Sequence, residues 1–516
     1  MMDKKSFWQT PLSRRSFLQQ GAKGGALLAI TPFLMDRLPH FWNSPASGQI
    51  ATATLEKEEI EKLLRIALER GGDFSEVYIE NRQSSNILLE ESKVKSAHLG
   101  ISQGVGVRVI AGNKTGYAYS DDFSFSKLEE AARVASYIAT SGAPSPRTVN
   151  ISPGKLPSYI TVKIPPEKIA EEKKLKLLTE ADQAARSYDK RISQVYVTYY
   201  DEVRHRTIAN SEGLWVRSEL PLLWFVVQAL SSHEGKRHLG RKRLSEHSGF
   251  ELFDKYKVAD AAREAAREAI AMLEAQEAPA GEMPVVIGNG WGGVLVHEAV
   301  GHGMEGDGIY RQDSIYAGKV GEKVATPLVT LIDDGTLPNF RGTINFDDEG
   351  TPCKRTVLVE KGILKGYMHD LLSAKLLKMK RTGNGRRESF RYYPIPRMTN
   401  TFMDNGPHTP EEIIRATEKG IFVQSLSGGS VNTTTGQFNF DVREAYMIDD
   451  GKRSYPVRDA TLIGRGFEVL ENIDMVGNDL AFGPGICGKG QAAEVTAGQP
   501  TIRIAKRIMV GGTRAR

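Results

Sequence analysis

The feature that most constrains this chain is a pair of histidines five residues apart in a segment framed by glycines. His297 and His302 follow an apolar run, and Glu298 lies directly after the first of them. Neutral imidazole is the commonest metal ligand among side chains, and a glutamate beside a zinc site can accept a proton from water. In the His-Glu-x-x-His pattern, both imidazoles lie one helical turn apart on one face. Here the interval is one residue longer.

The longer interval predicts a distorted helix. At about 100° per residue, five residues subtend roughly 500°, which leaves the two rings ~140° apart around an ideal helix. One wide π-type turn would narrow that angle, and Gly301 makes a break of the helix easy. We therefore expect the helix to be distorted or to end near Gly301. The competing interpretation is that His297 packs in a core while His302 is a solvated turn residue.

Length and composition set the broad class. A chain of 516 residues predicts two domains or three, and contents of 40% hydrophobic and 25% charged residues are those of a soluble globular protein. The net charge of +5 is small and forms no long basic run, which argues against a nucleic-acid partner. Only two cysteines occur, Cys353 and Cys487, so the chain is no disulfide scaffold.

The N-terminus predicts export. Residues 13–18 form a twin-arginine pattern, and the apolar run at 24–34 is too short for a bilayer span, which needs about 20 residues. We expect residues 1–53 to be a Tat-type signal and leader, cleaved after Ala46 or Ala53, and the protein to be periplasmic or extracytoplasmic rather than cytoplasmic. An uncleaved signal anchor is the alternative; otherwise no stable membrane span is expected.

The remaining chain predicts the α+β class in two parts. Residues 54–280 alternate helix, several strands and helix twice, which indicates an N-terminal α+β domain of antiparallel strands with flanking helices, and a degenerate internal duplication. Residues 281–516 are β-rich and carry the histidine helix. The basic segment at 235–242 is expected to be a solvated edge or a loop rather than a polyanion site. A capping box at Ser126 predicts a helix start, and a second helix is expected from Pro166.

A catalytic zinc site normally has three protein ligands and a water molecule, so two histidines leave one ligand to find. A thiolate is a strong zinc ligand, and the glycines around Cys487 would let it approach a metal closely. On chemical grounds alone, Cys487 is only slightly favoured over Glu305 as the third zinc ligand. A disulfide between Cys353 and Cys487 is a further alternative. The full set of candidates is Glu305, Asp307, His369 and Cys487.

A glycine-rich segment at 383–387 could hold an anion through backbone amides and the guanidinium groups of Arg386 and Arg387. The chain contains no phosphate-binding glycine motif of the nucleotide-binding types, so a nucleotide site is not expected. We expect the two arginines to pair with Glu388 and nearby acids, or with a peptide substrate.

Several motifs carry a resemblance to the TldD branch of the TldD/PmbA metalloprotease family. The resemblance covers residues 284–513, and the N-terminal half is similar more diffusely. The segments that carry it are 297–307, 345–352, 362–368, 383–388, 396–400, 460–464, Cys487-Gly-Lys and 510–513. The loop after Cys487 is one residue shorter before Gly490 than the family pattern, and the export signal is also a departure from better-known relatives, which look cytoplasmic.

The resemblance implies a zinc peptidase whose metal is held by His297, His302 and Cys487, with Glu298 as the general base. It also implies a homodimer, or a heterodimer with a TldE/PmbA-like paralogue, since the PmbA (TldE) branch is similar in fold but lacks the metal motif. Such dimers look like enzymes that cleave peptides or unfolded segments threaded into an internal cavity.

Two other functions remain open. The first is a hydrolase that uses Cys487 as a nucleophile activated by a histidine, although no local cysteine-peptidase signature surrounds it. The second is a non-enzymatic regulatory or scaffold partner of a TldD/TldE-type complex, because family members have carried a gyrase-modulator label. An exported protein would not meet gyrase, and a pure scaffold would need no stoichiometric zinc.

Overall fold

The computed structural model describes residues 54–138, 148–155 and 157–512. The predicted export signal therefore lies outside the described residues. Within the described ranges, no helix is long and apolar enough to cross a membrane. Helices and many strands occur together in this part of the chain, and the predicted α+β class is confirmed.

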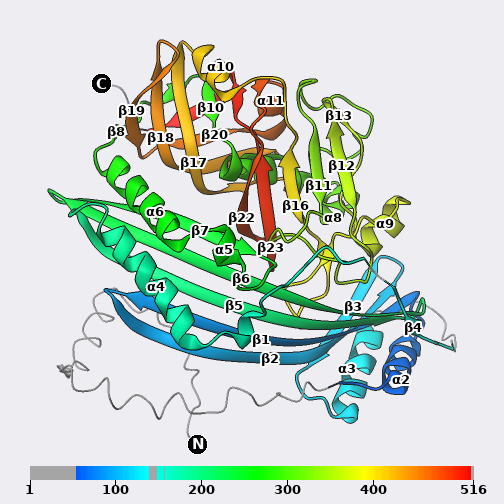
Figure 1. Ribbon diagram of the computed structural model, residues 1–516. Helices are drawn as coiled ribbons and strands as arrows, with labels where there is room; N and C mark the ends of the chain where they lie inside the picture. Colours follow the sequence, from blue (N-terminus) through cyan, green and yellow to red (C-terminus); the bar gives the residue numbers. More distant parts are fainter. Residues whose placement is uncertain (1–53, 139–147, 156, 513–516) are drawn as a thin grey trace, which may run out of the picture. The chain divides into compact units, whose positions relative to one another are not determined.

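A largely antiparallel sheet of long strands dominates residues 74–246 (Figure 1). The strands follow the order β3-β2-β1-β5-β6, and both β4 and β7 pair with β6. Their bounds are β1 Phe74–Glu90, β2 Lys93–Ala111, β3 Lys114–Ser120, β4 Ser152–Pro153, β5 Ile192–Asn210, β6 Leu214–His233 and β7 Lys236–Glu246. Sequence patterns predict shorter, separate strands here, because polar residues interrupt the apolar runs of β1 and β5.

The basic segment at 235–242 enters β7, so the prediction of a loop is wrong, whereas the prediction of an edge holds. Glu234 and Gly235 have φ angles of 48° and 77°. Such a pair of left-handed residues closes a two-residue hairpin turn, and β6 and β7 pair on either side of it. The sequence does not mark this turn, because Glu-Gly is not one of the usual Asn-Gly or Asp-Gly pairs.

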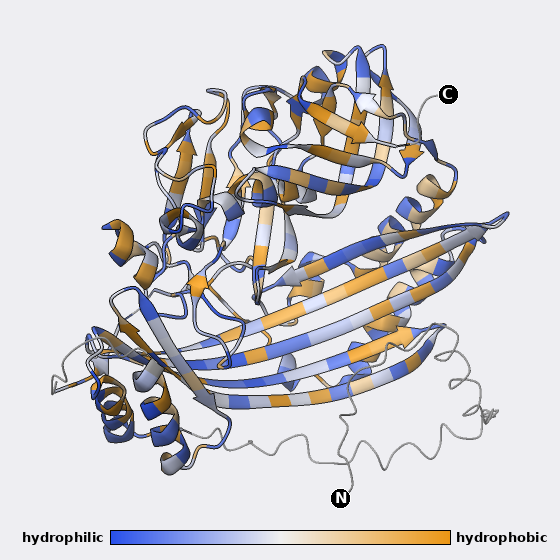
Figure 2. Cartoon of the chain, turned by 180° about the vertical axis from the view of Figure 1, so that it is seen from behind, coloured by the Kyte–Doolittle hydropathy of each residue, from blue (hydrophilic) through white to orange (hydrophobic). Residues whose placement is uncertain are grey.

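Two pairs of helices cover one face of this sheet. Their bounds are α2 Lys57–Leu68, α3 Phe125–Ile138, α4 Glu171–Arg186 and α6 Val258–Leu273, with the short α5 at Leu252–Lys255. Val77 packs with α2 and α3, and Leu89, on the same face of β1, packs with α4 and α6. Figure 2 shows apolar and polar residues alternating along the strands. The predicted order of helix, strands and helix thus occurs twice.

Two predicted helix starts are wrong by a few residues. The carbonyl of Ser124, not of Ser126, accepts the first hydrogen bonds of α3, so the capping box at Ser126 does not form the cap. Pro166 opens a short 3-10 turn, η2 Pro166–Lys168, and α4 begins at Glu171.

The opposite face of the long sheet carries buried charges that meet the C-terminal half of the chain. Arg108 on β2 donates to Glu349 at 2.7 Å, and Arg387 donates to Glu76. Arg386 donates to the carbonyls of Met398 and Glu494. Both arginines of the glycine-rich segment are therefore buried and pair with acids, Arg387 with Glu76 and Arg386 with Glu494 at 3.9 Å. The expected pairing with acids is confirmed, but the acids are distant in sequence and the Glu388 carboxylate is not one of them among the described contacts.

The C-terminal half contains a ten-stranded and a six-stranded sheet. The first holds β8 Gln276–Glu277, β9 Gly281–Glu282, β10 Val285–Ile287, β17 Lys419–Val431, β18 Gln437–Asp449, β19 Lys452–Arg458, β20 Thr461–Arg465, β21 Ile473–Val476, β24 Ile502–Ile504 and β25 Ile508–Gly511. The second holds β11 Leu331–Asp334, β12 Arg355–Glu360, β13 Ile363–Leu364, β16 Asn400–Met403, β22 Ala481–Gly488 and β23 Ala492–Gln499. The pair β14 Gly385–Arg386 and β15 Ile395–Pro396 stands apart, and the short helices are α8 Gly306–Tyr310, α9 Leu371–Leu377, α10 Pro410–Arg415 and α11 Gly466–Leu470.

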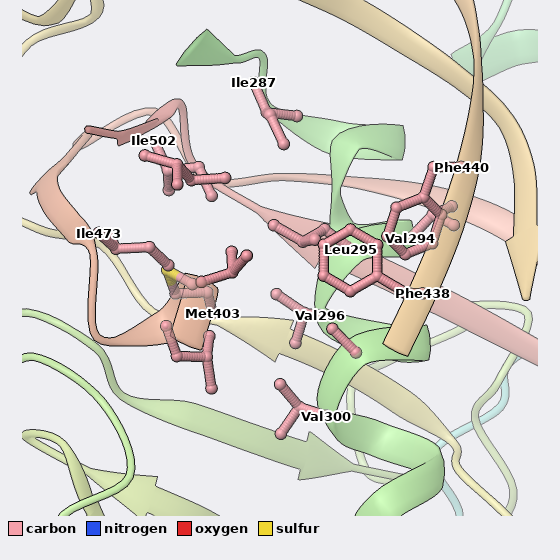
Figure 3. Close-up of a cluster of buried hydrophobic side chains, with 14 of the residues drawn as sticks. Ile287, Val294, Leu295, Val296, Val300, Met403, Phe438, Phe440, Ile473 and Ile502 are labelled. Carbon is pink, nitrogen blue, oxygen red and sulfur yellow. The ribbon is translucent and has the colours of Figure 1, made fainter. Parts of the chain in front are cut away.

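The histidine helix runs through the apolar core of this half. Figure 3 shows Leu295, Val296 and Val300 packed among residues from both sheets, such as Phe438 and Met403. All five side chains are buried to within 1% of complete burial. Packing on several sides fixes the helix in place, and therefore also the histidines that it carries.

Candidate metal centre

The histidine segment changes helix type three times within fifteen residues. Its parts are the 3-10 turn η3 Gly290–Gly293, α7 Val294–Val296, the π-helical turn η4 His297–Gly301 and the 3-10 turn η5 His302–Met304. The N–H of His302 donates to the carbonyl of His297, which is the i to i+5 hydrogen bond of a π turn. The predicted distortion is confirmed, and it brings the two imidazoles to 5.1 Å between ring centroids.

Gly301 has another role than the predicted one. Its φ is −54°, so the backbone stays in the right-handed helical region and does not break there. A Cβ at this position would lie 2.1 Å from the Sδ atom of Met398. The glycine is thus required because the π turn packs closely against Met398, in the loop between β15 and β16.

Three potential metal ligands meet at this turn. The ligand atoms of His297, His302 and Cys487 all lie within 4.8 Å of one another, and Cys487 Sγ is 3.2 Å from His302 Nε2. The His302 side chain is only 9% exposed, so the interpretation of it as a solvated turn residue is wrong. Cys353 and Cys487 are both free thiols, which removes the alternative of a disulfide between them.

The donor set suits zinc. Burial raises the pKa of the Cys487 thiol, but the neighbouring His297 and His302 outweigh it and bring that pKa to about 4, so the sulfur is a thiolate. Nδ1 of His297 is buried without a hydrogen-bond partner among the described residues, so this ring has a nitrogen that no protein group satisfies. Two imidazoles and one thiolate are three ligands of the kind that catalytic zinc takes, with a position left for water.

Glu298 lies beside the three donors. Its carboxylate is 3.7 Å from Nε2 of His302, and its side chain is 17% exposed. Burial is the main cause that raises the pKa of this carboxyl, although both histidines lower it. A carboxylate with a raised pKa in a partly open position is well placed to accept and return a proton.

The other ligand candidates occupy different positions. Glu305 accepts from Nδ1 of His302 at 2.9 Å, and Asp307 accepts from Lys489 at 2.6 Å, so both support the centre from outside. Nδ1 of His369 lies 3.2 Å from the hydroxyl of Ser373, in a separate buried cluster. The structure does not bring His369 to the three donors.

Two cations of the site were not predicted. Lys489 contacts Glu305 at 3.0 Å as well as Asp307. Arg397 donates to the carbonyl of Cys487 at 2.8 Å and thereby fixes the end of β22 that carries the thiolate. Both residues lie in segments that carry the family resemblance, Lys489 in Cys487-Gly-Lys and Arg397 in 396–400, and this was the available signal.

The donors open onto a cleft of about 700 Å³. One wall of the cleft is the end of β17, residues 427–431. This part of β17 pairs with β18 on one side only, because the pairing of β17 with β10 on its other side ends at Val423. In the described chain this leaves an open strand edge facing the cleft. The remaining lining includes Trp291, Arg243, Asp307, Arg311, Ile486 and Lys489.

Comparison with known proteins matches most of the described chain to one family. Models of the PmbA/TldA metallopeptidase match domain 1 at residues 75–139, the central domain at 164–273 and the C-terminal domain at 280–512. A Haemophilus influenzae protein named Metalloprotease TldD homolog is 38% identical over 91% of this chain and 99% of its own. A Saccharolobus solfataricus protein named Zinc metalloprotease TldD homolog is 25% identical over 87% of this chain and 99% of its own. In fold, the chain resembles TldE from Thermococcus kodakarensis, with a TM-score of 0.69 and 23% identity over 88% of this chain and all of that one.

Proposed function

Since this chain belongs to the PmbA/TldD metallopeptidase family, we propose that it is a zinc-dependent peptidase with the metal on His297, His302 and Cys487. The observation that carries the proposal is the meeting of these three donor atoms within 4.8 Å beside a half-buried glutamate on a cleft. The name of the Saccharolobus relative supports zinc as the metal.

Zinc held by these three residues would supply a Lewis acid and would lower the pKa of a water molecule towards ~7. Glu298, which lines the cleft, is placed to accept a proton from the attacking water and to return it to the leaving amine. Burial suits Glu298 to both steps, because a carboxyl with a raised pKa binds the proton more firmly between them. Glu305 keeps the ring of His302 turned so that Nε2 faces the cleft side of the site.

The substrate that fits this cleft is an extended peptide or an unfolded segment of a polypeptide. An open strand edge can pair with the main chain of such a segment whatever its side chains. Residues 427–430 are largely exposed, and the space beside Gly428 where a Cβ would point is open. Main-chain pairing of this kind would hold the substrate along the wall of the cleft that faces Glu298.

A partner subunit is part of the proposal, either a second copy or a paralogue without the metal motif. Residues 93–104 of β2 pair with β1 on one side, and no strand among the described residues covers their other side. Leu99 is 78% exposed and Ile101 is 56% exposed on this segment. A long strand edge with large exposed apolar side chains is a typical site for pairing between chains.

Export by a Tat-type signal is the last part of the proposal, and it rests on the sequence alone: the twin arginines, Phe17 and Leu18 after them, and the apolar run at 24–34. Changing Arg14 and Arg15 to lysine should retain the protein in the cytoplasm if the signal is of this type. Fractionation of cells that express both forms measures this directly, and equal distribution of the two forms would contradict it.

Elemental analysis tests the metal centre. The purified wild-type protein should hold zinc in a stoichiometric amount, and Cys487→Ser should lose most of it. Cys353→Ser is the matched control, because that thiol is equally buried but lies against the carbonyl of Gly383, away from the centre. Zinc retained in full by Cys487→Ser would contradict the ligand set. Activity that survives chelation but not alkylation would favour the cysteine hydrolase instead.

A further inference from the structure

A second cavity, of about 470 Å³, adjoins the metal cleft, and Arg243 and Trp291 line both. We call this second cavity the basic groove; its lining includes Arg241, Lys242, Arg243, Tyr256, Phe340, Arg443 and Phe482. Because two residues belong to both cavities, a peptide bound across the metal cleft would pass Arg243 where it enters the groove.

The carboxylates that line the basic groove already have cationic partners. Glu246 pairs with Lys255, Glu264 and Glu444 pair with Arg267, and Glu268 pairs with Arg443. By contrast, Arg241, Lys242 and Arg243 have no ion pair within the part of the chain that the structure describes. The lining therefore presents three basic side chains that no carboxylate of the described residues holds in an ion pair.

Arg243 is held at the junction of the two cavities by strand geometry and by aromatic rings. On β7, Gly240 and Leu244 face α6, so Arg241 and Arg243 alternate to the opposite face. The guanidinium of Arg243 lies 5.7 Å from the ring of Trp291 and 5.9 Å from that of Trp224. Rings on two sides restrict the side chain while its donors stay free.

The positive charges around Arg243 also favour the binding of an anion. Burial first, and then the neighbouring Arg241, Arg443 and Arg341, lower the pKa of Arg243 to about 10. Arginines gathered against one another in a half-buried wall repel, and an incoming anion relieves that repulsion. The planar guanidinium fork matches a carboxylate with two parallel hydrogen bonds, which makes a carboxylate the fitting ligand.

We propose that Arg243, assisted by Arg241, binds a carboxylate of the peptide substrate where the metal cleft meets the basic groove. The carboxylate is either the C-terminal group of the peptide or an acidic side chain next to the cleaved bond. This inference rests on the proposed peptidase function and adds a substrate preference to it. Peptides with a carboxylate at that position bind more tightly than the same peptides without it.

Binding to the inactive Glu298→Gln protein tests the proposal without any need for hydrolysis. The probes are three fluorescent forms of one neutral peptide: the C-terminal acid, the C-terminal amide, and the amide with one internal aspartate. Fluorescence anisotropy should give at least one carboxylate form a Kd about tenfold below that of the plain amide, the size expected for one charge-assisted contact. The carboxylate form that binds more tightly than the amide shows whether the site binds the C-terminal carboxylate or an acidic side chain.

Arg243→Gln in the same background should remove that preference, and Arg243→Lys should keep part of it. Arg237→Gln is the matched control, since Arg237 is exposed on the same strand and lines neither cavity. Equal Kd values for all three probes overturn the proposal even if an Arg243 variant fails to fold, because that comparison needs no such variant. A full preference in Arg243→Gln overturns it as well. A wild-type protein that holds zinc and cleaves all three forms equally keeps the peptidase function and rejects only this inference.

Discussion

Glu305 accepts a hydrogen bond from Nδ1 of His302 at 2.9 Å, and this contact decides that Nε2 is the nitrogen that faces Cys487. Burial raises the pKa of Glu305, but Lys489 and His302 outweigh it and lower that pKa to about 2, so the acceptor is ionised. A carboxylate behind a ligating histidine fixes the ring and makes it a stronger ligand. Glu305 thus supports the proposed metal centre from behind His302 and is not one of the three proposed ligands.

Glu305→Gln should therefore weaken zinc binding without abolishing it. The amide keeps an acceptor for His302 but loses the charge, and a loss of about 10- to 100-fold in zinc affinity is expected. Competition with a chromophoric chelator measures the affinity. Glu322→Gln, an exposed glutamate outside the centre, is the control and should bind zinc as the wild type does. An unchanged affinity in Glu305→Gln would show that this carboxylate has no part in holding His302.

Glu298→Gln should separate metal binding from hydrolysis. The residue is 3.7 Å from His302 but is not one of the three donors, so zinc content should match that of the wild type. Peptide hydrolysis should fall on the order of 10²- to 10⁴-fold, because the amide cannot accept the proton from water. Both quantities are measured on one preparation. Full activity in Glu298→Gln would mean that another group is the general base.

Gly301→Ala should damage the π turn by a steric effect alone. Its methyl group would lie 2.1 Å from Sδ of buried Met398, and overpacking of this kind costs about 1–3 kcal/mol of unfolding free energy. Gly301→Ala combined with Met398→Ala should recover part of the loss, because the second change removes the obstructing atom. Urea unfolding of the variants measures both effects.

The control for this prediction is Gly308→Ala on α8. A Cβ at Gly308 meets nothing within 4 Å, so this change should be neutral or slightly stabilising, as alanine favours helix. If Gly301→Ala were as harmless as Gly308→Ala, the close approach to Met398 would not constrain the turn.

The histidine spacing was enough to predict the distorted helix, because a five-residue interval between two ligands on one side leaves few backbone solutions. The same reasoning could not separate the roles of Cys487 and Glu305, since both residue types bind zinc and the sequence gives no distances. The fold separates them: β22 brings the thiolate to the turn, whereas Glu305 meets the far nitrogen of His302. For Gly301, the sequence showed conformational freedom, but the actual constraint is Met398, a neighbour almost a hundred residues away.

The long strands were harder to predict for a related reason. In β5, Asp201, Glu202 and Arg204 interrupt an apolar pattern, and polar interruptions usually mark turns. Here the strand continues, because its polar residues are buried against partners from distant segments: Lys174 donates to Asp201, and Arg204 lies 3.5 Å from Glu494. Ion pairs between segments so far apart in sequence leave no local pattern to read.

Lysine at the open edge of β2 should prevent association of subunits. Leu99 and Ile101 are among the most exposed large apolar side chains of the described chain, and charges on a strand edge oppose pairing with another strand. Light scattering after size-exclusion chromatography should show a dimer for the wild type, alone or with its paralogue, and a monomer for Leu99→Lys with Ile101→Lys. Lysine at Tyr256, exposed on another part of the molecule, is the control. A dimer that survives both lysines would place the interface elsewhere.

Acid should destabilise the protein through His247. Burial lowers the pKa of this imidazole to about 4, and its Nδ1–H donates to the carbonyl of Pro221 at 2.6 Å, so the folded state holds the ring neutral. In the unfolded chain a histidine takes up a proton near pH 6.5. The stability that comes from the neutral ring is therefore fully present above pH 6.5 and is lost as the pH falls towards 4. Between pH 7 and pH 5 the loss is about 2 kcal/mol for this one group.

His247→Asn should remove that part of the pH dependence, because asparagine can still donate to Pro221 but does not titrate. The measurement is urea unfolding at pH 7 and pH 5 in a Cys487→Ser background, which takes away the pH dependence of zinc binding itself. The stability difference between the two pH values should shrink by about 2 kcal/mol in His247→Asn. The exposed His233→Asn, outside the proposed interface, is the control and should leave the difference as it is. An unchanged difference in His247→Asn would mean that the folded protein protonates this buried ring as readily as the unfolded chain does.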